Sequence, residues 1–314
     1  MNVRRLIRPS AAAGAVALGL VAVSACSGSS AADGRENGRL KVVASFYPLQ
    51  YLAEQIGGDH VAVSTLTKPG VEPHDLELKP RQTAQLGEAG YILYLKGVQP
   101  AVDKAIEQAD VPHKTDAGTL TELETHGAGH GADDGHDHGE AGGDPHLWLD
   151  PVKYAEVAEG VSAALAEADP DNAAAYRKNA DVLTGKLAGL NTRFEQGLKN
   201  TATKTFITTH SAFGYLAERY GLDQEGIAGL DPEAEPSPAR IKEIQSIAEK
   251  EKAGTVFFEP LADDRAAKTL AKDTGLRTDV LDPLEGITDR SRGRDYFQVM
   301  ESNLTALQKA LGAK

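Results

Sequence analysis

Three of the nine histidines have sequence settings typical of metal ligands. His74 and His210 each follow a short run that is predicted to be a β-strand, and His146 lies in the segment DPHLWLDP at 144–151. In parallel α/β folds, ligands bind just beyond the carboxyl ends of strands. Asp282 also follows a predicted strand. Three imidazoles and one carboxylate make a complete tetrahedral set for Zn²⁺, so we predict a zinc site formed by these four residues.

Glu259 offers a second carboxylate at the end of a predicted strand, the run TVFF at 255–258. It is either a ligand itself or a partner that orients a ligating imidazole through a hydrogen bond. Its position in the sequence leaves both roles open.

A different group of histidines lies in the segment 124–143, which consists mainly of Gly, His, Asp, Glu and Ala. These are His126, His130, His136 and His138. The segment has nothing to bury, so we predict a disordered loop that collects metal ions weakly. Ordering such a loop costs about 1–2 kcal/mol per residue, which argues against a tight site there.

The rest of the chain alternates predicted strands with helices. Strands are predicted at 40–45, 61–65, 91–95, 205–209, 255–258 and 278–281. Helices are predicted at 48–56, 81–88, 101–109, 212–220, 238–252, 265–274 and 296–311. Strands separated by helices indicate parallel sheets covered on both faces, and two such series indicate two α/β lobes. Between them, residues 171–199 place apolar side chains at spacings of three and four, which predicts one long helix.

The N-terminus is typical of an exported lipoprotein. Three arginines at positions 4, 5 and 8 precede a short apolar run, 11–23, that is too short to span a bilayer. Small residues then lead to Cys26, the one cysteine of the chain. We predict a signal peptide at 1–25, lipidation of Cys26 and a flexible tether at 26–39. The protein is therefore expected outside the cytoplasm, anchored to the cell membrane.

Composition excludes several classes of protein. The 314 residues are 41% hydrophobic and 25% charged, which is ordinary for a globular chain of about two domains. The formal net charge of −13 argues against nucleic-acid binding, which needs clustered Lys and Arg. A single cysteine excludes an intrachain disulfide and a thiolate zinc cluster.

Several motifs together resemble one family. They are FYPL at 46–49, EPHDLE at 72–77, the internal His-rich segment, DPHLWLDP at 144–151, HSAFGYL at 210–216, FFEP at 257–260 and LDPL at 281–284. In this order and spacing, the chain resembles the cluster A-I substrate-binding proteins of zinc and manganese ABC importers, and most of all their zinc (ZnuA-type) branch.

The resemblance implies two lobes joined by a single rigid helix, with a metal ion in the cleft between them. It places an N-terminal lobe at 40–170, the linking helix at 171–200 and a C-terminal lobe at 201–314. It also implies His74, His146 and His210 as ligands, with Asp282 as the fourth, although some zinc members use a glutamate or a water there. A monomer that serves the permease and ATPase of a zinc importer is expected.

Two alternatives remain open from the sequence. One is a manganese- or iron-binding protein on the same scaffold; the nitrogen-rich ligand set favours zinc, because manganese members tend to have a glutamate at the position of His210. The other is a secreted zinc hydrolase, which would need an open coordination position and a general base. The motifs His-Glu-x-x-His and Gly-x-Ser-x-Gly do not occur in the chain, so we expect no enzyme.

Overall fold

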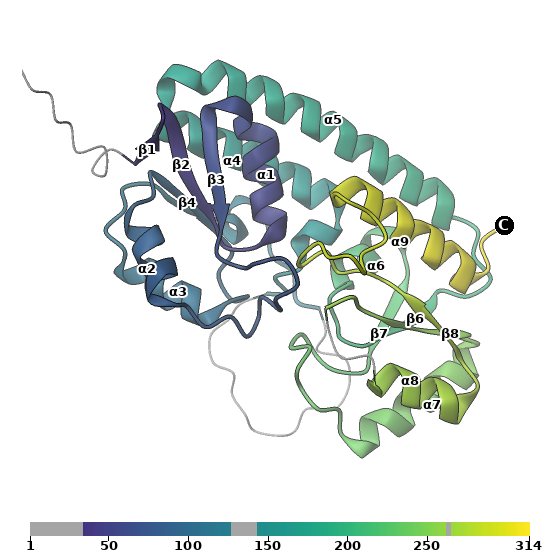
Figure 1. Ribbon diagram of the computed structural model, residues 1–314. Coiled ribbons are helices and arrows are strands. Elements are labelled where there is room, and N and C mark those ends of the chain that lie inside the picture. Colours follow the sequence, from purple (N-terminus) through teal and green to yellow (C-terminus); the bar gives the residue numbers. More distant parts are fainter. Residues whose placement is uncertain (1–33, 127–142, 262–264) are drawn as a thin grey trace, which may run out of the picture.

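The computed structural model describes residues 34–126, 143–261 and 265–314. Two separate parallel sheets, each covered by helices, form two lobes, and a long helix runs across both of them (Figure 1). This arrangement is the two-lobed α/β fold predicted from the sequence. Within the described ranges, no helix is both long and apolar enough to cross a membrane.

The sheet of the N-terminal lobe is built around one buried strand. Its strands are β1 (Arg35–Glu36), β2 (Arg39–Ala44), β3 (Val61–Thr65), β4 (Tyr91–Tyr94) and β5 (Lys114–Asp116). β2 pairs in parallel with β3 on one side and with β4 on the other, and β4 pairs in parallel with β5. β1 adds a short antiparallel pair at the start of β2. β2 lies between two strands, and its second half, Val42–Ala44, is apolar and buried, as expected for a central parallel strand covered on both faces.

The four α-helices of this lobe share a proline at their start. They are α1 (Tyr47–Gly57), α2 (Pro80–Gly87), α3 (Pro100–Gln108) and α4 (Pro151–Ala168), with 3-10 turns at Gly58–His60, Ala117–Leu120 and Leu147–Leu149. Proline lies in the first turn of all four helices, where its missing N–H costs nothing. Asp150 caps α4 by accepting a hydrogen bond from the backbone N–H of Val152, 2.8 Å away.

The sheet of the C-terminal lobe has four parallel strands in the order β7-β6-β8-β9. These strands are β6 (Thr205–Thr208), β7 (Asp223–Gly226), β8 (Thr255–Phe258) and β9 (Arg277–Val280). The helices are α6 (Gly214–Tyr220), α7 (Pro238–Glu251), α8 (Arg265–Thr274) and α9 (Tyr296–Leu311). All four strands point the same way, so the segments that follow β6, β8 and β9 emerge at one edge of the sheet.

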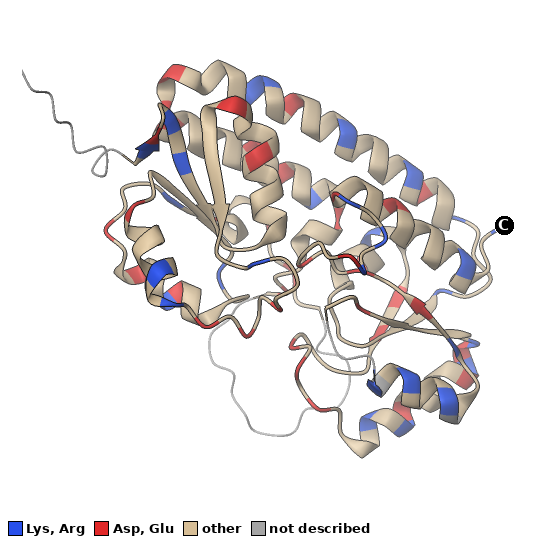
Figure 2. Ribbon diagram, viewed as in Figure 1, with Lys and Arg blue, Asp and Glu red and all other residues tan. Residues whose placement is uncertain are grey.

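Helix α5 (Ala173–Leu198) joins the lobes and follows a 3-10 turn at Pro170–Asn172. Its 26 residues span about 39 Å at 1.5 Å per residue. The apolar residues spaced three and four apart are all buried: Tyr176, Ala180, Leu183, Leu187, Leu190, Phe194 and Leu198. The exposed positions of α5 include both basic and acidic residues (Figure 2). A helix is therefore present in the segment predicted to form one, and it begins two residues later than predicted.

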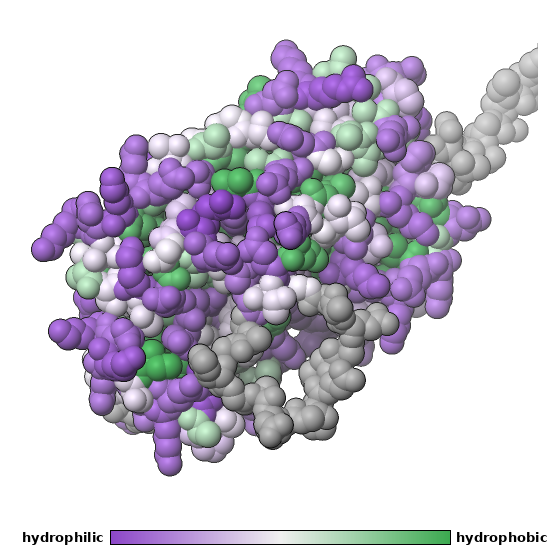
Figure 3. Space-filling model, turned by 180° about the vertical axis from the view of Figure 1, so that it is seen from behind, coloured by the Kyte–Doolittle hydropathy of each residue, from purple (hydrophilic) through white to green (hydrophobic). Residues whose placement is uncertain are grey.

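One hydrophobic core continues from the first lobe into the second beneath α5. Tyr51 of α1 stacks on Tyr296 of α9 with ring centroids 5.8 Å apart, and Tyr154 of α4 lies 4.7 Å from the same ring. Smaller clusters cover the outer face of each sheet. Seen from behind, the surface is mostly hydrophilic, with apolar residues in small separate patches (Figure 3).

Some elements were not predicted. The short strands β1 and β5 and the polar strand β7 (DQEG) lack the apolar runs that identified the buried strands. Helix α4 begins at Pro151, the last residue of the segment 144–151, and its many alanines give little contrast between an apolar and a polar face. The predicted disorder of 124–143 is wrong at its ends: residues 124–126 and 143 are described, and Asp144 N–H donates to the carbonyl of Glu124 at 2.7 Å.

Candidate metal centre

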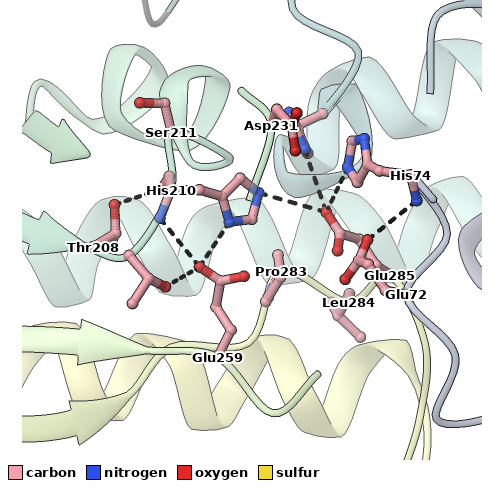
Figure 4. Close-up of polar contacts among 12 residues, drawn as sticks. Glu72, His74, Thr208, His210, Ser211, Asp231, Glu259, Pro283, Leu284 and Glu285 are labelled. Carbon is pink, nitrogen blue, oxygen red and sulfur yellow. Dashed lines mark hydrogen bonds and ion pairs between the residues drawn. The ribbon is translucent and has the colours of Figure 1, made fainter. Parts of the chain in front are cut away.

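Three histidines and one glutamate converge between the lobes. His74 lies on the loop between β3 and α2, His146 immediately before the turn Leu147–Leu149, and His210 on the loop after β6. The fourth member is Glu285, on the loop after β9. One potential ligand atom from each residue lies within 4.8 Å of all the others. Figure 4 shows His74 and His210 pointing toward Glu285 from opposite sides.

A single carboxylate oxygen faces all three imidazoles. Glu285 Oε1 lies 3.3 Å from Nε2 of His74, 3.4 Å from Nε2 of His146 and 3.6 Å from Nε2 of His210. His146, His210 and Glu285 are fully buried, whereas the His74 side chain is 12% exposed. His74 therefore marks the side from which solvent reaches the site.

Several buried polar atoms of this site lack a hydrogen-bond partner. Nε2 of His146, Nε2 of His210 and Oε2 of Glu285 are buried without a hydrogen-bond partner. A buried polar atom without a partner costs roughly 1–3 kcal/mol, so several at one point need a compensating ligand. Three nitrogen donors and one carboxylate fit a tetrahedral Zn²⁺ ion.

The other nitrogen of each buried imidazole is held by a carboxylate. His146 Nδ1 lies 2.7 Å from Asp144 Oδ1, which also accepts the backbone N–H of His146 at 2.9 Å. His210 Nδ1 lies 2.7 Å from Glu259 Oε1, and Thr209 Oγ1 donates to the same oxygen. An ionised carboxylate only accepts, so both imidazoles donate from Nδ1, and Nε2 is the ring atom that a metal ion would bind.

The charges of these carboxylates follow from their surroundings. Burial alone would raise the pKa of Asp144, but the charge of His146 and hydrogen bonds from His126 and His146 lower it to about 2. Burial likewise opposes ionisation of Glu285, yet the three surrounding histidines hold its pKa well below its usual range. Burial lowers the pKa of His210, but Glu259 and Glu285 raise it more, and the net pKa lies well above its ordinary value. Asp144 and Glu285 are therefore ionised, and their negative charges favour the binding of a cation.

Asp282 does not belong to this group, contrary to the prediction that it is the fourth ligand. Its Oδ1 accepts the backbone N–H of Leu284 at 2.8 Å. Asn303 of α9 holds the backbone on both sides, accepting from Asp282 N–H at 3.0 Å and donating to its carbonyl at 2.7 Å. Leu284 has φ +62° in the resulting turn, and the next residue, Glu285, is aimed at the histidines. Asp282 shapes the loop, and the longer side chain three residues later reaches the site.

Two carboxylates of the site were missed or left without a role. No role was predicted for Asp144, although an aspartate two residues before a histidine commonly accepts the backbone N–H of that histidine. Glu285 follows the motif LDPL directly, and nothing in the spacing distinguishes it from Asp282. Glu259 contacts Nδ1 of His210, the ring nitrogen that faces away from Glu285. This contact fits the second of its two predicted roles, in which it orients an imidazole through a hydrogen bond.

The remaining predicted metal-binding histidines divide into two groups. His126 is described: its ring packs edge-on against Tyr215 with centroids 4.5 Å apart, away from the group around Glu285. His130, His136 and His138 lie outside the described residues, as does Cys26.

Fold and site together define a two-lobed α/β protein with three histidines and one glutamate gathered between its lobes. The chain belongs to the ZnuA family, described as the periplasmic component A of the zinc-uptake complex, whose family model matches residues 42–310. It is 36% identical over 292 residues to the zinc-binding lipoprotein AdcA of Streptococcus pneumoniae, covering 91% of this chain and 58% of AdcA. The chain thus spans little more than half the length of that relative.

A second relative matches over nearly the whole length of both chains, and a crystal structure superimposes on most of this chain. The high-affinity zinc uptake system protein ZnuA of Bacillus subtilis is 34% identical over 308 residues, with 93% of this chain and 94% of the relative covered. The crystal structure of Zn(II)-bound AdcA from Streptococcus pneumoniae superimposes with a TM-score of 0.73 at 35% identity, covering 87% of this chain and 58% of that one. The TM-score shows that this crystal structure and the present chain share their fold.

Proposed function

We propose that this protein captures one Zn²⁺ ion outside the cytoplasm, using His74, His146, His210 and Glu285, and delivers it to an ABC importer. The observation that carries the proposal is the convergence of three imidazole Nε2 atoms on one oxygen of Glu285, at 3.3–3.6 Å. The names of the relatives, a zinc-binding lipoprotein and a zinc uptake system protein, support the same cargo.

The donor set favours zinc over the alternatives. Manganese prefers oxygen ligands, whereas three nitrogens and one oxygen suit zinc. All four positions of a tetrahedral shell are filled by protein atoms, which is typical of a site that holds its ion rather than one that activates a water. A zinc hydrolase on this scaffold has no support from the site.

Delivery requires an importer in the membrane and an anchor that keeps the protein close to it. We infer that the partners are the permease and ATPase of a zinc ABC importer, and that the protein acts as a monomer. Lipidation of Cys26, after removal of 1–25, would hold it at the membrane surface on the segment 26–39. Partition of the expressed protein into detergent, lost in Cys26→Ala, tests the anchor.

Metal analysis tests the cargo. The mature protein, stripped with a chelator and then exposed to equal concentrations of Zn²⁺ and Mn²⁺, should retain one tightly bound zinc per chain after gel filtration. Retention of manganese or iron in preference to zinc would overturn the assignment. Replacing His130, His136 and His138 with Gln should remove only weaker equivalents, because the tight site uses none of them.

A further inference from the structure

A second cluster of metal-ligating side chains lies outside the site around Glu285. We call it the outer cluster; it consists of Glu124, His126 and Glu218, whose ligand atoms lie within 4.8 Å of one another. His126 Nε2 is 2.6 Å from Glu218 Oε2 and 3.6 Å from Glu124 Oε2. Glu218 belongs to α6 of the C-terminal lobe, so the cluster joins two distant parts of the chain.

The position of His126 is built into the fold. Its ring lies edge-on against Tyr215, whose hydroxyl accepts from the backbone N–H of Glu124 at 2.9 Å and donates to the carbonyl of Asp144 at 2.8 Å. A Cβ atom on Gly214 would collide with the His126 side chain, so the glycine leaves the space that the ring occupies. The His126 side chain is only 13% exposed.

The chemistry of the two ring nitrogens differs. Nδ1 lies 3.1 Å from Asp144 Oδ2, an ionised carboxylate that only accepts, so Nδ1 carries a proton. Nε2 faces Glu218, which is also an acceptor. At 2.6 Å the two atoms share a hydrogen bond, so Nε2 carries a proton as well. A metal ion would take the place of that proton and bind both atoms, with the exposed Glu218 side chain moving slightly away.

We propose that Glu124, His126 and Glu218 form a second divalent-cation site, and that Asp144 serves this site and the one around Glu285 at the same time. One imidazole and two carboxylates suit a zinc-class ion, with water completing the shell. His126 and Glu218 also line a cavity of about 330 Å³, which gives an ion access from solvent.

Nearby cations make the outer cluster the weaker of the two sites. Lys153 Nζ lies 2.6 Å from Glu124 Oε1 and neutralises part of its charge. Arg240 lines the same cavity, but its guanidinium is engaged by Glu225 and Glu243 at 2.8 Å each. A third competitor is the proton on Nε2, which an incoming metal ion must displace.

Asp144 connects the two sites through its two oxygens. Oδ1 holds Nδ1 of His146 at 2.7 Å, and Oδ2 holds Nδ1 of His126 at 3.1 Å. Each imidazole would bind its ion through Nε2, so the same carboxylate orients one ligand of each site. Loss of its charge should weaken both, whereas loss of Glu218 should affect only the outer cluster.

Calorimetric titration with Zn²⁺ tests the proposal in the full mature chain with His130, His136 and His138 replaced by Gln. This background should bind one tight and one weaker equivalent. His126→Gln and Glu218→Gln should each remove the weaker equivalent or reduce its affinity at least about tenfold, and leave the tight one unchanged. Asp144→Asn should lower both affinities, by roughly 10–100-fold, the usual effect of removing a carboxylate that orients a ligand.

The controls separate binding from folding and from the primary site. His113→Gln, a histidine outside both groups, should leave both equivalents unchanged. The Glu218 side chain is 63% exposed, so Glu218→Gln should melt at the temperature of the background. A background that lacks the weaker equivalent, or a weaker equivalent that survives both His126→Gln and Glu218→Gln, would overturn the outer cluster. A background that lacks only the tight equivalent would instead contradict the primary site and leave the outer cluster supported.

Discussion

Glu285 Oε1 lies 3.3 Å from His74 Nε2, and this contact joins a loop of the C-terminal lobe to a loop of the N-terminal lobe. His146 and Glu285 are fully buried, whereas His74 lies at the solvent side. A metal ion held by this set therefore bridges the lobes, and His74 is the ligand nearest to solvent. Release of the ion should begin at His74.

Glu285 and Asp282 are expected to differ in their effect on zinc affinity. Glu285→Ala removes a proposed ligand and should lower the affinity by more than about 100-fold, above the roughly 10–100-fold effect of losing a carboxylate that only orients a ligand. Asp282→Asn should change affinity less and stability more, because its Oδ1 holds the turn at Leu284. Chelator competition and thermal melting of the two variants measure these effects. Equal zinc affinity in Glu285→Ala and the wild type would contradict the assignment.

Glu259 is expected to support His210 without binding zinc. Glu259→Gln keeps the shape but loses the charge that holds His210 Nδ1 at 2.7 Å. The affinity should fall by roughly 10–100-fold while the stoichiometry stays at one tight equivalent. A titration that shows no tight equivalent at all would mean that Glu259 is itself a ligand.

Asp169 should make stability depend on pH. Burial would raise its pKa, but hydrogen bonds from Arg35, Tyr176 and Asn172 lower it on balance. Because the folded pKa lies below the unfolded value of about 3.9, the stabilisation is complete above that value and is lost as the pH falls through the folded pKa. Asp169→Asn should therefore lower the free energy of unfolding by about 1–3 kcal/mol at pH 7.

The pH dependence distinguishes this effect from a general loss of packing. In urea denaturation of the metal-free protein, the difference between wild type and Asp169→Asn should shrink as the pH is lowered below 4. Asp171→Asn, an exposed neighbour, should show no comparable difference at pH 7. A gap of constant size from pH 7 to pH 3 would refute the role of the charge.

The lobes are expected to move little when zinc binds. The core is continuous beneath α5, and a continuous helix resists sharp bending. Trp148 Nε1 also donates to the carbonyl of Pro283 at 2.7 Å, and Tyr296 donates to the carbonyl of Trp148 at 2.7 Å. Small-angle scattering profiles of metal-free and zinc-loaded protein should nearly coincide. A compaction on the scale of hinge-type binding proteins would show that the shared core opens.

The sequence predicted the fold well where apolar patterns are strong. The periodicity in 171–199 identified the linking helix, and the runs around 42 and 207 identified buried strands. The polar edge strand β7 gave no such signal, because an edge strand can be stabilised by backbone pairing alone. The structure places all three predicted histidines together, since two of them follow strands of parallel sheets.

The fourth member of the site depends on loop geometry that spacing does not encode. Asp282 and Glu285 lie on the same loop, and the choice between them is made by the hydrogen bond from Leu284 and by Asn303, 18 residues further along the chain than Glu285. The same holds for His126. The Gly- and His-rich sequence around His126 predicted disorder. Asp144, 18 residues later, and Tyr215, on a helix of the other lobe, nevertheless hold its ring in a fixed position.

A crystal structure of the zinc-loaded mature protein, with anomalous data at the zinc edge, tests the central claim most directly. The account predicts one strong anomalous peak between the lobes, with Nε2 of His74, His146 and His210 at about 2.0–2.1 Å and a Glu285 oxygen at about 2.0–2.2 Å. A strong peak coordinated by Asp282 or Glu259 in place of Glu285, or a water in the fourth position, would contradict it.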